Sequence, residues 1–184
     1  MPRTKKGERK GPSSKVQFRL LKEKYNKKGT VLQKSKMEEI IRKSGGKGTR
    51  VSEKYTHVLM TEVESKTMDL VRKAALILGT GGGVSIMEKH IDAAYNVCDI
   101  SLHRKKLSVE AHPKTIPLPR VRKLVQLALD KHGVRISKEA LKMVRCFIVE
   151  LTEELARKSV AVMELADRKT LMAKDLEAVV KVYY

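Results

Sequence analysis

The sequence has few cysteines and no long apolar segment. Its two cysteines, Cys98 and Cys146, fit no CxxC or Cys/His metal spacing, and two are too few for a disulfide scaffold. No apolar stretch reaches the roughly 18 residues that span a bilayer, and the basic N-terminus lacks the apolar region of a signal peptide. We therefore expect a soluble protein that is not secreted, occupies a reducing compartment and makes no membrane contact.

Acidic residues are scarce relative to basic ones. The 184 residues include 40 Lys and Arg against 21 Asp and Glu, a formal net charge of +19. Residues 1–31 hold 11 of the basic residues against only two acidic ones, Glu8 and Glu23, so this segment alone carries +9. Such a charge favours a polyanionic partner, because each neutralised phosphate releases condensed counterions. Nucleic acid is the favoured class of partner, although ribosomal and membrane-surface proteins can be equally basic.

Three blocks of the sequence occur twice, at one constant offset of 85 residues. The matching blocks are Arg50-Val51-Ser52 with Arg135-Ile136-Ser137, Leu70-Val71-Arg72-Lys73 with Leu155-Ala156-Arg157-Lys158, and Ser85-Ile86-Met87-Glu88-Lys89 with Thr170-Leu171-Met172-Ala173-Lys174. A fixed period without gaps indicates one structural unit that has been duplicated and fused. Each copy has roughly 70 residues, a size at which a lone core is marginal, so we expect the copies to share a core.

Composition and periodicity divide the chain into four segments. Residues 1–30 are rich in basic and small residues, which predicts a disordered basic tail with one short amphipathic helix near its end. Residues 31–98 are the first copy and residues 116–184 the second. Residues 99–115 interrupt the helical pattern with a cluster of basic side chains and form a basic linker.

Each copy has a short, a long and again a short helical segment, which predicts an all-α fold. Apolar residues spaced three and four apart predict long helices of about 27 residues that begin at Ser52 and Ser137. Ser35 with Glu38, and Ser85 with Glu88, have the spacing of capping boxes and predict the starts of two short helices. The remaining boundaries are predicted at Gly45-Gly46, Gly79 to Gly83, Pro117 or Pro119, and Gly133.

With this layout the chain resembles two histone folds in tandem, a histone doublet of the archaeal or giant-virus type. The resemblance is carried by Val134-Arg135-Ile136-Ser137 before the second long helix and by residues 168–176 after it, and it covers Val31–Val97 and Ile116–Val182. It implies that the two units clasp head to tail as an intramolecular handshake. Each unit's first loop then lies beside the other unit's second loop on a DNA-facing edge.

The resemblance also implies the DNA-binding residues. Arg50 and Arg135 correspond to loop arginines that enter the minor groove. The expected phosphate contacts are Lys169, Thr170 and Ser85 in the second loops, and Arg120, Arg122, Lys123, Lys36 and Arg42 on the first helices. For any one cation on a first helix, a solvated surface charge is an equally good interpretation.

Two further features of the family distinguish the copies. Arg168 and Asp175 match an ion pair that braces the second loop, whereas Gly83 and His90 occupy those positions in the first copy. His90 has no second metal ligand near it in the sequence, so we expect a surface or packed histidine. The family assembles through a four-helix bundle, and Val162, Leu165 and Ala166 would form that surface here. The glycine-rich counterpart from Leu78 to Gly83 predicts asymmetric assembly, either between chains through the second copy or with another histone-fold chain.

The resemblance implies a DNA-packaging protein that wraps double-stranded DNA largely without sequence specificity. It would be associated with a chromosome: the nucleoid if archaeal, the virion or host nucleus if viral. The alternative is a histone-fold transcription factor or coactivator subunit that binds defined DNA sites or protein partners. We expect no enzyme activity, cofactor, metal or small-molecule substrate, because no catalytic arrangement recurs between the copies. Gly79 to Gly83 follows a helix and ends in Gly-Val-Ser, unlike a nucleotide-binding loop.

Overall fold

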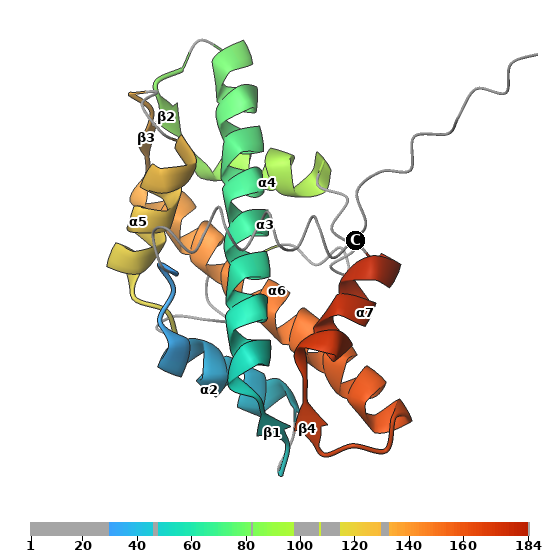
Figure 1. The fold of residues 1–184 in the computed structure, drawn as a ribbon. Coiled ribbons are helices and arrows are strands. Elements are labelled where there is room, and N and C mark those ends of the chain that lie inside the picture. The colour runs from blue at the N-terminus through green and yellow to red at the C-terminus, as the bar shows by residue number, and fades with distance from the viewer. Residues whose placement is uncertain are drawn as a thin grey trace, which may run out of the picture. The chain divides into compact units, whose positions relative to one another are not determined.

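The computed structural model describes residues 30–45, 48–81, 83–97, 107, 115–129 and 133–183. Six helices lie within these residues, as two consecutive sets of three. The first set comprises α2 (Lys34–Gly45), α3 (Glu53–Thr80) and α4 (Glu88–Val97), and the second comprises α5 (Leu118–Leu129), α6 (Lys138–Leu165) and α7 (Ala173–Tyr183) (Figure 1). The mainly helical fold confirms the predicted class. The short helix expected in the tail and most of the expected linker lie outside the described residues.

Two short parallel strand pairs join the two sets. The pairs are β1 (Arg50–Val51) with β4 (Thr170–Leu171), and β2 (Ser85–Ile86) with β3 (Arg135–Ile136) (Figure 1). In each pair, the residues before the long helix of one set lie beside the residues after the long helix of the other set. The same register holds in both pairs, with first residue opposite first residue. The two sets are therefore interlocked through their loops.

The two sets share one hydrophobic core. The long helices α3 and α6 pack against each other, α2 of the first set packs on α6, and α5 of the second set packs on α3. Fully buried side chains contribute to this core, among them Leu59 and Leu70 of α3 and Phe147 and Leu151 of α6. A short helix cannot cover a 28-residue neighbour, so each long helix completes its burial against the other set.

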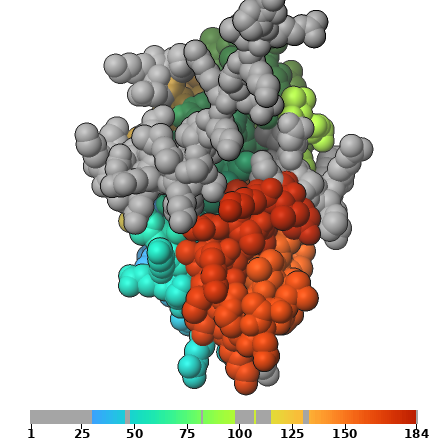
Figure 2. Space-filling model, turned by 45° about the vertical axis from the view of Figure 1, so that its right-hand side comes forward, coloured from blue at the N-terminus to red at the C-terminus, as the bar shows by residue number. Residues whose placement is uncertain are grey.

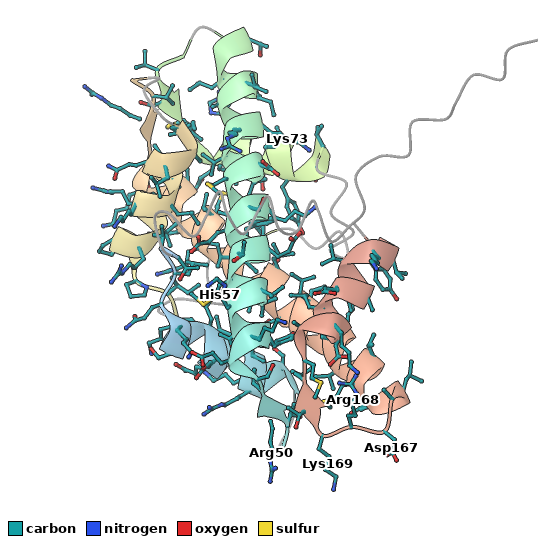
Figure 3. The ribbon with its side chains drawn as sticks, viewed as in Figure 1. Arg50, His57, Lys73, Asp167, Arg168 and Lys169 are labelled. Carbon is teal, nitrogen blue, oxygen red and sulfur yellow. The ribbon has the colours of Figure 1, made fainter. Side chains whose placement is uncertain are left out.

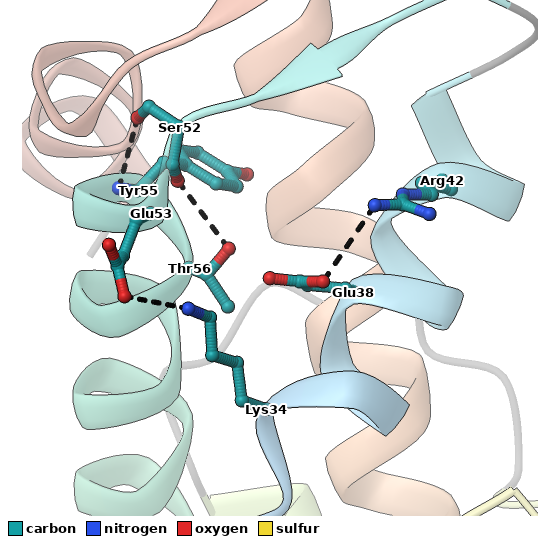
Figure 4. Close-up of polar contacts among 7 residues, drawn as sticks. All are labelled: Lys34, Glu38, Arg42, Ser52, Glu53, Tyr55 and Thr56. Atoms are coloured by element: carbon teal, nitrogen blue, oxygen red, sulfur yellow. Dashed lines mark hydrogen bonds and ion pairs between the residues drawn. The ribbon is translucent and has the colours of Figure 1, made fainter.

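Serine caps begin both long helices, as the sequence predicts. The Ser52 hydroxyl accepts a hydrogen bond from the Tyr55 N–H at 3.2 Å (Figure 4). The Ser137 hydroxyl accepts one from the Ala140 N–H at 3.0 Å. Each bond satisfies a donor that the first helical turn would otherwise leave free. These caps fix where the backbone leaves the strand and enters the helix.

Two other predicted caps are wrong. Ser35 lies inside α2, which begins at Lys34, because the Gln33 carbonyl already accepts hydrogen bonds from two N–H groups of the first turn. Ser85 is not a cap but the first residue of β2, where pairing with β3 holds it extended. The helix that follows begins only at Glu88. Tertiary strand pairing thus overrides the local capping-box pattern.

A buried carboxylate anchors the chain just before α2. One oxygen of Glu64, in the middle of α3, accepts hydrogen bonds from the N–H groups of Val31 at 2.7 Å and Leu32 at 2.8 Å. Burial raises the pKa of Glu64, and the two hydrogen bonds partly oppose that rise. At the offset of 85, Val149 replaces Glu64 and Pro117, which has no N–H, replaces Leu32. The second set therefore has one backbone donor fewer to satisfy.

We expect Glu64→Gln to change how stability depends on pH, because an amide keeps an acceptor oxygen but does not titrate. Since its pKa is raised by folding, the Glu64 carboxyl contributes stability below its unfolded pKa, and that contribution is lost as pH rises through the folded pKa. Urea unfolding at several pH values should therefore show the wild-type protein losing stability relative to Glu64→Gln as pH rises.

The control for this experiment is Glu64→Ala, which removes the acceptor altogether. It should be less stable than Glu64→Gln at every pH, by roughly 1–3 kcal/mol, because two N–H groups lose their partner. A wild-type stability that kept a constant difference from Glu64→Gln across the pH range would contradict the buried titrating carboxyl.

Candidate nucleic-acid interface

The loops that flank the long helices meet in two places. We call residues 48–51 and 167–171 the β1–β4 tip, and residues 83–86 and 133–136 the β2–β3 tip. The two tips lie at opposite ends of α3 (Figure 1). Each tip combines a pair of strands, the N-terminus of a long helix and the N-terminus of a short helix. Helix N-termini expose free N–H groups and carry partial positive charge, so both tips suit an anion.

The β1–β4 tip brings two cations together. The Arg50 N–H donates to the Lys169 carbonyl at 3.0 Å, and the Ser52 N–H donates to the Leu171 carbonyl at 3.1 Å. The side chains of Arg50 and Lys169 are exposed and project from the same end of the molecule (Figure 3). In the space-filling view, residues near the first loop, in cyan, project beside the orange and red surface of α6 and α7 (Figure 2). Thr170, also expected at this edge, is half-buried opposite Arg50.

The β2–β3 tip repeats the backbone geometry but not the charge. The Arg135 N–H donates to the Val84 carbonyl at 3.0 Å, and the Ser137 N–H donates to the Ile86 carbonyl, also at 3.0 Å. Arg135 is exposed and Ser85 half-buried, so the structure brings this expected pair together. Val84, with 65% of its surface exposed, stands where Lys169 stands at the other tip. The second loop of this tip therefore presents no cation among its described residues.

An ion pair stiffens the second loop of the β1–β4 tip. The Arg168 guanidinium donates two hydrogen bonds to the Asp175 carboxylate, one of them at 3.1 Å. Asp175 is 1% exposed and also accepts from the Met172 N–H at 2.8 Å. The carboxylate raises the pKa of Arg168, so the guanidinium stays charged. One buried acid thereby fixes both the loop and the start of α7.

In the first set, His90 makes one of the two interactions of Asp175, the hydrogen bond to a backbone N–H at the start of the short helix. The Nδ1 atom of His90 accepts a hydrogen bond from the Met87 N–H at 2.9 Å, the position at which Asp175 accepts from Met172. Only an unprotonated Nδ1 can accept. Gly83 stands in the place of Arg168, so this loop has no guanidinium to complete a brace. Sequence reasoning missed this capping role of His90, although the offset of 85 from Asp175 was a signal for it.

The five cations expected on the first helices fall into two groups. On α2, Lys36 pairs with Glu39 at 3.0 Å. Arg42 lies 3.8 Å from Glu38 (Figure 4). On α5 there is no acidic residue, and the cations there, Arg120, Arg122 and Lys123, are exposed and form no ion pair with the described residues. The α5 group is therefore better prepared to meet a phosphate than the α2 group, whose glutamates compete for the same cations.

The residues expected to form an assembly surface lie at the end of α6. Leu165, the last helical residue, is 90% exposed, Val162 is half-buried and Ala166 is exposed. In the first set, Leu78 is buried and Thr80 occupies the position that corresponds to Leu165. The sets therefore differ at this surface as well.

The described ranges hold no group of three or more His, Cys, Asp or Glu side chains able to bind a metal ion. None of the described helices combines the length and the apolar character needed to cross a membrane.

Removing the two matched acceptors should destabilise the protein unequally. Asp175→Ala should lower the free energy of unfolding by roughly 3 kcal/mol, because it leaves Arg168 and a backbone N–H without their buried partner. His90→Ala removes a single neutral hydrogen bond and should cost about 1 kcal/mol. Urea unfolding of the two full-length variants measures both losses, and equal losses would contradict the assigned brace.

The chain is similar to known proteins in part of its sequence and in its fold. Residues 114–180 match the family model described as histone-like transcription factor (CBF/NF-Y) and archaeal histone. No curated protein matches the chain in sequence. The crystal structure of the histone from Methanopyrus kandleri matches the fold with a TM-score of 0.63 and 24% identity, over 79% of this chain and 91% of that one. The second set therefore matches a histone-like family model in sequence, and the chain has a fold similar to that of the Methanopyrus kandleri histone.

Proposed function

We propose that the chain is a DNA-packaging histone doublet, which binds and wraps double-stranded DNA largely without sequence specificity. One observation carries the proposal: the crossed strand pairs place the first-loop arginine of each set beside the second loop of the other set. The protein thereby has two anion-binding tips within one chain. A histone-like, DNA-binding role is also what the matched family supports, and that family is in general not enzymatic.

The proposed domains follow the helix sets. Residues 31–98 and 116–184 are the two histone folds, residues 1–30 the basic tail and residues 99–115 the basic linker. The match to the Methanopyrus kandleri histone supports this division, because 79% of the chain is more than one three-helix set and so includes helices of both. The two folds would act as an intramolecular handshake, with no separate partner needed to complete the core.

The exposed cations define how DNA would be held. Arg50 and Arg135 are proposed to enter the minor groove at the two tips. The negative electrostatic potential of a narrow minor groove attracts a guanidinium. Phosphates would be contacted by Lys169, Thr170, Ser85, Arg120, Arg122 and Lys123. Lys36 and Arg42 would contribute less, because glutamates on α2 already pair with them. None of these groups reads base edges, so affinity should depend on salt far more than on sequence.

The alternative is a histone-fold transcription factor or coactivator subunit, a class that the matched family description also names. Two features favour packaging: the net charge of +19, and the presence of both helix sets in one chain. A factor that reads a defined site needs base contacts, whereas wrapping needs phosphate neutralisation along the surface. Packaging places the protein on a chromosome, in a nucleoid if the source is archaeal and in a virion or host nucleus if it is viral.

Nuclease digestion of random-sequence DNA with the purified full-length protein tests the choice. Packaging predicts protected fragments of regular length that are lost as salt rises, because phosphate contacts dominate the affinity. A transcription factor predicts no regular protection on random DNA and strong protection at one selected sequence. The latter result would overturn the proposal.

We also propose that neighbouring chains meet through the end of α6, as a four-helix bundle formed by Val162, Leu165 and Ala166. Leu165 is 90% exposed at the helix end, beside a half-buried Val162, so a partner that covered it would remove apolar surface from water. The first set lacks an equivalent leucine, so the assembly would be asymmetric, either between two second sets or with a different histone-fold chain.

Leu165→Glu should therefore weaken association between DNA-bound chains and shorten the protected fragments, without loss of helical structure. The control is Leu76→Glu, which places the same charge at a residue of α3 that is 72% exposed. Analytical ultracentrifugation of the complexes, with circular dichroism to check folding, measures the difference. Unchanged assembly of Leu165→Glu, or equal weakening by both substitutions, would contradict the proposed surface.

A further inference from the structure

We infer that the protein holds DNA with a fixed polarity: the β1–β4 tip is the anchor, and the β2–β3 tip is the end that releases first. The inference rests on the proposed DNA-binding function and concerns how that function is divided between the tips. Residues 84 and 169, which occupy the same position in the two copies, determine the difference. One is an exposed valine and the other an exposed lysine.

Charge is the first argument. Each strand pair presents one exposed arginine, Arg50 or Arg135, but only the β1–β4 tip adds a lysine from the opposite strand end. Each additional phosphate contact contributes about 0.9 to the dependence of log affinity on log salt. The Val84 carbonyl accepts a hydrogen bond from the Arg135 N–H, just as the Lys169 carbonyl accepts one from the Arg50 N–H. The Val84 side chain, however, offers a phosphate neither a hydrogen-bond donor nor a charge.

Acidic residues near the tips do not cancel this difference. Asp167 is exposed in the second loop of the β1–β4 tip, two residues before Lys169 (Figure 3). The β2–β3 tip has its own exposed acid, Glu88, at the start of α4, where the other tip has Ala173. Each tip has a second exposed acid in the first turn of its long helix, Glu53 in α3 or Glu139 in α6, so the acids are equal in number and the lysine remains the difference between the tips.

Preorganisation is the second argument. The second loop of the β1–β4 tip is tied to α7 through Arg168 and Asp175, and its Arg168 N–H donates to the Met163 carbonyl at 3.1 Å. At the β2–β3 tip, the matching bond from the Gly83 N–H to the Leu78 carbonyl is 3.5 Å long, and no guanidinium supports the loop. A loop that is already ordered loses less conformational entropy when it binds, so the braced tip binds more tightly.

The test exchanges the two residues in the full-length protein, as Lys169→Val, Val84→Lys and the double variant. The controls make the same changes in charge on the last turn of α7: Lys181→Val and Val182→Lys, both at exposed residues. The readouts are the slope of log affinity against log salt on random-sequence DNA, and nuclease-protected length during a salt titration.

Lys169→Val should make the fall of log affinity with log salt less steep, by about 0.9 in slope. Val84→Lys should make it steeper by about 0.9, and the controls should change it less. Val84→Lys should also raise the salt concentration at which protected fragments begin to shorten, because the weak end is strengthened. The inference is overturned if the wild-type protein binds with a salt-dependent slope but each variant matches its control. A wild-type protein with no salt-dependent binding to random DNA would instead refute the proposed function itself.

Discussion

The crossed pairing of loops between the two helix sets is the constraint on which the rest of the structure depends. Backbone hydrogen bonds from Arg50 and Ser52 to the β4 side, and from Arg135 and Ser137 to the β2 side, bring together residues that are far apart in the sequence. A two-residue strand has little stability of its own, so these bonds persist only because α3 and α6 cross in one core. The core determines the shape of the tips, and the tips determine where the cations lie.

Much of the fold follows from local pattern. The apolar period of three and four predicts the two long helices, and Ser52 and Ser137 mark their starts because each is followed by an uninterrupted helical run. The capping-box pattern fails at Ser85, where the partner strand comes from the other copy and holds the residue extended. A local motif contains no information about a partner so distant in the sequence, and the same limit hides the contact of Glu64 with Val31 and Leu32.

The candidate site was only partly predictable for a related reason. Lys36 and Arg42 look like phosphate contacts by position, but their pairing with glutamates on the same helix depends on side-chain geometry. His90 looks like a surface histidine, yet its ring accepts the backbone N–H that a carboxylate accepts in the other set. Where His90 replaces Asp175, the backbone donor keeps an acceptor, and where Glu64 is lost, one of its two donors is removed because Pro117 stands in the place of Leu32. Satisfying buried and helix-end donors is therefore the stricter requirement, and charge is free to vary.

The presence of both sets in one chain makes that freedom useful. In a dimer of identical chains, every substitution appears at both tips, because one sequence supplies both copies. A valine in place of the tip lysine would then remove the cation from both ends. Within a single chain, Val84 and Lys169 can differ while the backbone of both tips stays the same. A single chain with both sets can thus keep an almost symmetric backbone while its two tips hold the proposed ligand, the DNA duplex, with unequal strength.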